Sequence, residues 1–86
     1  MYRAVFSRRA QRAFMELPQR DAKRVKQAIE KVMRDPRGQG TIKLEHAPVA
    51  QYRRRVGNWR ILFDIDDAAQ VIEIVDIRKR DEGTYR

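Results

Sequence analysis

Arginine side chains are concentrated in the stretch Tyr52 to Phe63, which reads Tyr-Arg-Arg-Arg-Val-Gly-Asn-Trp-Arg-Ile-Leu-Phe. A guanidinium group offers a planar fork of donors that matches the oxygens of a phosphate, and it keeps its proton at physiological pH. These residues could therefore bind a phosphate and stabilise negative charge that develops on it. They are poor general bases, because arginine hardly ever loses its proton.

The same stretch predicts a β-hairpin. Two runs rich in β-branched and aromatic residues flank Gly57-Asn58, and glycine at the first turn position suits a two-residue type II′ turn. Strand alternation then divides the side chains into an apolar face, Tyr52, Val56, Trp59, Ile61 and Phe63, and a basic face, Arg53, Arg55 and Arg60. Arg55 lies directly opposite Arg60 in this register. Because like charges in a cross-strand pair cost stability, the pair indicates an anionic partner.

Arg54 is the exception on this hairpin, because alternation puts it on the apolar face. Its position indicates either a different local register or a place at the edge of the sheet, from which the side chain reaches solvent.

The flanking sequence predicts the elements that hold the hairpin. Residues 2–6 are expected to form a short strand. Ser7 suits the N-cap of a helix with apolar residues at helical spacing, which Pro18 ends. A longer helix is predicted from about Gln19 to Arg34, and Asp35-Pro36 stops it.

Beyond the second helix, residues 37–49 are predicted to be a loop, and the hairpin follows. A four-residue turn at 66–69 leads into a strand at 71–77. In this register Phe63 faces Ile72 and Ile61 faces Ile74, so that Glu73 and Val75 fall on the basic face.

The order β-α-α-β-β-β predicts a single α+β domain over residues 1–86. Two N-terminal helices are expected on one face of a small, mostly antiparallel sheet, with a partly open basic face opposite. The formal net charge is +8, and 15 of the 20 basic residues are arginine. This excess favours nucleic acid or an acidic protein as the partner.

Several function classes are not expected from this sequence. It has no cysteine, no spaced set of His, Asp and Glu for a metal, and no glycine-rich phosphate motif in the required context. We therefore expect no metal and no cofactor. No stretch is apolar enough for a membrane span or a signal peptide, so the chain is expected in the cytoplasm, without a membrane partner.

The element order and several short segments together resemble the RelE/ParE toxin superfamily of bacterial type II toxin–antitoxin systems. The segments are Leu17-Pro18, Asp35-Pro36, Lys43-Leu44, the hairpin at 52–63, Lys79-Arg80 and Tyr85-Arg86. The resemblance implies a RelE-like fold. For the RelE branch it also implies a metal-independent endoribonuclease, an mRNA interferase that inhibits translation by cutting mRNA on the ribosome and is neutralised by an antitoxin. The net charge of this chain suggests that its cognate antitoxin is acidic.

By the same resemblance, the basic site of the family corresponds to Arg53, Arg55, Arg60 and Arg80, and its C-terminal aromatic residue corresponds to Tyr85. RNA cleavage through the 2′-hydroxyl also needs groups that transfer protons. Tyr85, Glu73, Asp81 and Glu82 are candidates, although Tyr85 could instead stack on a base and each carboxylate could be held in an ion pair.

Two alternatives remain beside the ribonuclease. The ParE branch shares the fold but inhibits DNA gyrase, which makes it a binding protein. A non-catalytic RNA-binding module is favoured by the lack of an assigned base. The ribonuclease is favoured by the convergence of the basic-face arginines with Arg80 and Tyr85 at one end of the sheet.

Overall fold

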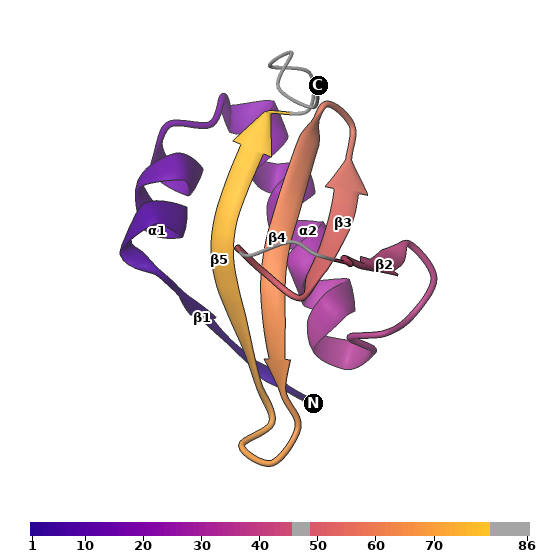
Figure 1. Ribbon diagram of the computed structural model, residues 1–86. Helices are drawn as coiled ribbons and strands as arrows, with labels where there is room; N and C mark the ends of the chain where they lie inside the picture. Colours follow the sequence, from indigo (N-terminus) through magenta and orange to yellow (C-terminus); the bar gives the residue numbers. More distant parts are fainter. Residues whose placement is uncertain (46–48, 80–86) are drawn as a thin grey trace.

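The computed structural model describes residues 1–45 and 49–79, which form two helices and a five-stranded sheet (Figure 1). The elements are β1 (Arg3–Phe6), α1 (Arg8–Met15), α2 (Gln19–Arg34), β2 (Thr41–Lys43), β3 (Tyr52–Val56), β4 (Trp59–Asp66) and β5 (Val71–Lys79). The strand order is β1-β5-β4-β3-β2. β1 runs parallel to β5, and the other neighbours are antiparallel. The predicted α+β fold, with a mostly antiparallel sheet, is confirmed.

Both helices begin and end close to where the sequence predicts. The Ser7 hydroxyl caps α1 by accepting a hydrogen bond from the Ala10 amide at 3.0 Å. Pro18 directly precedes α2, and Asp35, the residue before Pro36, ends it. The apolar stripes of the helices meet the sheet in one core, made of Ala10, Leu17, Val25, Ala28, Ile29, Val32, Ile61, Phe63, Ile72, Ile74 and Ile77.

β2 corrects the predicted loop at residues 37–49. Its three residues pair antiparallel with β3, with Thr41 opposite Arg54 and Lys43 opposite Tyr52. Three residues are too few for the alternation of polar and apolar side chains that marks a strand in a sequence. The pairing makes β3 an interior strand of the sheet.

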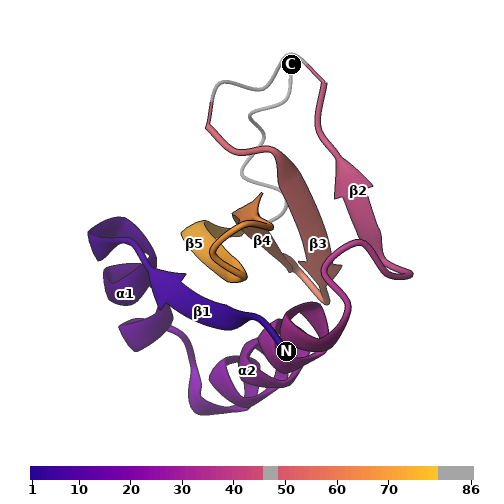
Figure 2. The ribbon, with the colours of Figure 1, turned by 90° about the horizontal axis from the view of Figure 1, so that it is seen from below.

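The face of the sheet away from the helices is partly covered. Figures 1 and 2 show residues 49–51 approaching β3 on the side opposite α1 and α2. The Gln51 amide donates to Asp64 at 2.8 Å, and the Gln51 side-chain oxygen accepts from the Ile65 amide at 3.1 Å. Ala50 and Leu62 are buried although neither belongs to the main core. The described residues leave the part of this face toward the β3–β4 turn open, where Arg55 and Arg78 are exposed.

Within the described residues, neither helix combines the length and the apolar character that crossing a membrane would need.

Candidate functional site

The β3–β4 hairpin has the predicted register. Val56 lies opposite Trp59, Arg55 opposite Arg60, and Tyr52 opposite Phe63. Gly57 has a φ of +58°, and Asn58 is not among the residues with positive φ, as a type II′ turn requires. Arg53, Arg55 and Arg60 therefore share the face of the sheet away from the helices, as predicted.

The pairing of β4 with β5 differs from the prediction. Phe63 lies opposite Ile74 and not Ile72, because the turn occupies residues 67–70, one residue later than predicted. The register then shifts between Leu62 and Phe63, since Leu62 lies opposite Asp76. Val75 is thus the extra residue of a β-bulge.

This bulge decides which side chains of β5 join the basic face. Beyond Val75 the alternation is inverted, so that Ile77 points into the core while Asp76 and Arg78 lie on the open face. Ser7 supports the bulge from the start of α1. Its hydroxyl donates to the Val75 carbonyl at 2.7 Å, and its amide donates to the Ile74 carbonyl at 2.9 Å.

Three arginines consequently lie side by side across three strands. Arg60 of β4 is opposite Arg55 of β3 on one side and opposite Arg78 of β5 on the other. We call Arg55, Arg60 and Arg78 the arginine row. Neighbouring strands are about 4.8 Å apart, so the row extends over roughly 10 Å of backbone. Arg55 and Arg78 are exposed, and Arg60 is half-buried.

Arg78 is the member of the row that sequence reasoning missed. Counting alternation without the bulge puts it on the helix side. The sequence did place Arg53 on this face. Arg53 lies two residues further along β3 from the turn than Arg55, in register with Leu62 and Asp76. Its side chain is half-buried.

Asp76 is a buried carboxylate beside the row, with 6% of its surface exposed. One carboxylate oxygen accepts from Arg78 Nε at 2.8 Å, and the other accepts from the Ile77 amide at 2.8 Å. This pairing fixes the direction of the Arg78 guanidinium and offsets part of the repulsion within the row.

The described part of the chain brings none of the predicted candidates for proton transfer to the row. Glu73 lies opposite Asp64, about 13 Å along β4 from Arg60. Arg80, Asp81, Glu82 and Tyr85 lie outside the described residues. Lys79, the last described residue of β5, lies opposite Trp59, at the end of the sheet that carries the row.

Arg54 lies on the helix side of the sheet, as alternation predicts. Because β2 pairs with β3, the interpretation of Arg54 as a residue at the sheet edge is wrong. The side chain instead passes close to Gly40, where a Cβ atom would lie 3.2 Å from Arg54 Cζ.

A second polar cluster lies at the far end of the sheet from the arginine row. Arg37 holds Asp67 with two hydrogen bonds, at 3.1 and 3.0 Å, and the Tyr2 hydroxyl donates to the same carboxylate at 2.6 Å. The Arg37 guanidinium and then the Tyr2 hydroxyl lower the pKa of Asp67, and the carboxylate in turn raises the pKa of Tyr2. We call these three residues the clasp, because they join the N-terminus, the α2–β2 connection and the β4–β5 turn.

Within residues 1–45 and 49–79, no three His, Cys, Asp or Glu side chains gather in a way that could hold a metal ion.

Comparison with protein families identifies the class of this molecule. The sequence model of the family described as "ParE toxin of type II toxin-antitoxin system, parDE" matches residues 4–83. The chain therefore belongs to the ParE toxin family, within the RelE/ParE superfamily, and is a toxin of a type II toxin–antitoxin system.

Solved structures show the same fold. The RelE of the archaeal RelE–RelB complex from Pyrococcus horikoshii has a TM-score of 0.79 and 24% identity, over 94% of this chain and 97% of that one. A chain of the toxin–antitoxin complex RelBE2 from Mycobacterium tuberculosis has a TM-score of 0.80 and 26% identity, over 92% and 98%. The isolated Escherichia coli RelE toxin has a TM-score of 0.81 and 20% identity, over 95% and 87%. A search of curated proteins found no match.

Proposed function

We propose that this toxin is a metal-independent endoribonuclease that cleaves ribosome-bound mRNA by attack of a 2′-hydroxyl on the adjacent phosphate. The observation that carries the proposal is the arginine row, which puts guanidinium groups from three strands on one open face. Such a strip suits a phosphate backbone, and it would stabilise the charge that builds up on the phosphorane as the bond to the 5′-oxygen breaks.

The residues take different roles in this proposal. Arg55 and Arg60 contact the scissile phosphate, and Arg53 and Arg80 complete the cationic set. Asp76 acts as a positioning residue, because its contact with Arg78 at 2.8 Å directs that guanidinium. Tyr85 stacks on a base next to the scissile bond, which orients it for attack. The row itself supplies no general base.

The proposed protein partner is a cognate acidic antitoxin. A net charge of +8 on 86 residues favours an acidic segment that orders when it binds. Two of the similar structures are toxin–antitoxin complexes, one of them between RelE and RelB. Co-expression with the neighbouring gene should give a tight complex.

Gyrase inhibition is the second candidate, because the matching family is described as the ParE toxin. In that case the basic face would bind protein or DNA without breaking a bond. A ribonuclease would cut the mRNA and leave the supercoiling reaction intact, whereas a gyrase inhibitor would block supercoiling and leave the mRNA intact.

The test applies purified toxin to a translation extract and to a gyrase supercoiling reaction. Primer extension on the mRNA should show new 5′ ends in phase with codons, while supercoiling proceeds normally. Loss of supercoiling without RNA cuts would identify a gyrase inhibitor. RNA binding with neither effect would identify a non-catalytic RNA-binding module.

A further inference from the structure

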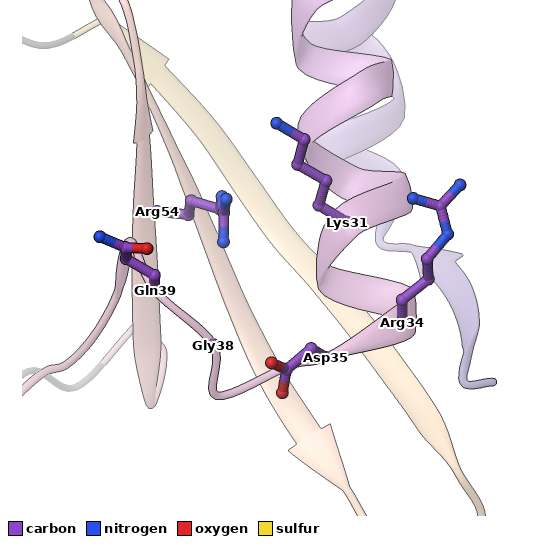
Figure 3. Close-up of a pocket in the computed structure, with 6 residues that line it drawn as sticks. All are labelled: Lys31, Arg34, Asp35, Gly38, Gln39 and Arg54. Atoms are coloured by element: carbon purple, nitrogen blue, oxygen red, sulfur yellow. The ribbon is translucent and has the colours of Figure 1, made fainter.

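A basic hollow lies on the helix side of the sheet, between the C-terminal end of α2, the α2–β2 connection and strand β3 (Figure 3). Its volume is about 260 Å³, and its lining is Lys31, Arg34, Asp35, Gly38, Gln39 and Arg54. The lining thus includes three cationic residues and one acidic residue, and the space is large enough for a small anionic group. Figure 3 shows the Arg34 guanidinium directed away from Arg54, so Lys31 and Arg54 are the cations that face each other across the hollow. The sheet separates this hollow from the arginine row.

The fold holds Arg54 in this hollow. Strand alternation directs its side chain toward α2, and pairing with both β2 and β4 keeps β3 in place. Gly40 has a φ of +99°, and its missing Cβ leaves room for the guanidinium, whose Cζ would lie 3.2 Å from such an atom. Figure 3 shows Arg54 extending from β3 toward α2, and Lys31 extending from α2 toward β3.

Nothing in the described part of the chain pairs with Arg54, although its side chain is half-buried. Asp35 is the acidic residue of the lining, but its carboxylate lies over its own turn, 2.6 Å from where a Cβ on Gly38 would be. Lys31 and Arg34 also have a local role, since cations in the last turn of a helix interact favourably with its dipole. Arg54 has no such role, and its desolvation costs stability unless an anion binds there.

We propose that this hollow is a binding site for the carboxylate of an aspartate or glutamate side chain on a protein partner. The guanidinium fork of Arg54 matches a carboxylate with two parallel hydrogen bonds, and Lys31 adds a second charge from the opposite wall. The site is independent of RNA cleavage, and it stands if the toxin cuts no RNA.

The shape and charge of the hollow favour a carboxylate over an RNA phosphate. A phosphodiester carries a ribose on each side, and these groups add bulk at the mouth of a hollow of about 260 Å³. A carboxylate at the end of a short side chain can enter alone. The lining also includes the Asp35 carboxylate, which repels negative charge. A phosphodiester strand carries several successive negative charges, so it is repelled more than a single carboxylate is.

The binding test is an NMR titration of the full-length toxin, observed at the Gly40 amide and the arginine Nε–H signals. The probes are the blocked tripeptide Gly-Glu-Gly, its twin Gly-Gln-Gly, and the dinucleotide ApA. The Glu peptide should shift the Gly40 and Arg54 signals in a saturable way, and the Gln twin should not. ApA should move the signals of the arginine row and leave Arg54 unchanged. If ApA shifts Arg54 and the Glu peptide does not, the hollow is a phosphate site and the proposal is wrong.

Variants separate binding from folding. Arg54→Met should weaken Glu-peptide binding by roughly tenfold or more, because it removes one charge-assisted pair. The control Arg20→Met, which changes an exposed arginine, should bind the peptide as the parent does. Because Arg54 has no partner among residues 1–45 and 49–79, Arg54→Met should melt at or above the parent temperature. A clearly lower melting temperature for Arg54→Met than for Arg20→Met would show that Arg54 serves folding, and would overturn the proposal.

Discussion

Arg60 has an arginine opposite it on both neighbouring strands, which puts three positive charges in one line across the sheet. In the free toxin this arrangement opposes folding, because like charges directly opposite each other destabilise a sheet. A bound phosphate chain would reverse the sign of the interaction. In the proposed function the row exchanges some stability for binding, and the three arginines should differ in how much stability each one costs.

Arg55→Ala should leave the free toxin as stable as the parent or more stable, by up to about 1 kcal/mol, because it removes one repulsive pair from the exposed end of the row. The gain should shrink as salt is added, since salt screens exposed charges. Thermal melts at low and high ionic strength measure both effects. A melting temperature clearly below the parent value would mean that Arg55 makes contacts that this account lacks.

Asp76→Asn should destabilise the toxin by on the order of 1–3 kcal/mol, because a buried charge-assisted contact to Arg78 is lost. Glu73→Gln is the matched control, since Glu73 is an exposed carboxylate on the same strand and face. Urea denaturation of both variants gives the comparison. Equal losses for the two would remove Asp76 from its positioning role.

At the scale of elements, the β-bulge explains both what the sequence predicts and what it does not. The hairpin register follows from Gly57-Asn58 and a period of two, and the helices follow from the Ser7 cap of α1, the prolines and the apolar spacing. The bulge at Val75 depends on hydrogen bonds from Ser7, which lies 68 positions away in the chain. No local sequence pattern predicts a contact between residues so far apart in the chain. Asp76 and Arg78 could therefore not be placed on the basic face from the sequence.

Ser7 has two roles that substitutions can separate. Ser7→Ala loses both the helix cap and the bond to the Val75 carbonyl, and should cost about 1–2 kcal/mol or more. Ser7→Asp keeps an acceptor for the cap but has no hydroxyl to donate to Val75, so its stability should lie between Ser7→Ala and the parent. If Ser7→Asp equals the parent in urea denaturation, the bond to the bulge contributes nothing.

The clasp should make stability depend on pH. Its contacts lower the pKa of Asp67 below the ordinary value of 3.8, so its contribution is present above that pH and disappears as the pH falls through the folded-state pKa. Asp67→Asn should therefore melt at a lower temperature than the parent at pH 7, and the difference should vanish at strongly acidic pH. A difference that stays constant across this range would show that the ionised carboxylate does not matter.

At the scale of the whole molecule, the positive charge is distributed over two sides of one sheet. The arginine row lies on the open face, and the hollow around Arg54 lies on the helix side. RNA and an acidic protein segment could therefore occupy different surfaces of the same toxin. The net charge predicts that anions bind, but the strand pairing determines where.

The central claim is that the arginine row acts in RNA cleavage, and the most direct measurement is the single-turnover rate on mRNA in programmed ribosomes. Arg60→Ala should cut at least roughly a hundredfold more slowly than the parent, because it loses a charge-assisted contact to the transition state. Arg9→Ala, which removes an exposed arginine of α1, should stay within a few-fold of the parent. Circular dichroism must show that both variants are folded. Cleavage by folded Arg60→Ala at the parent rate would contradict the account.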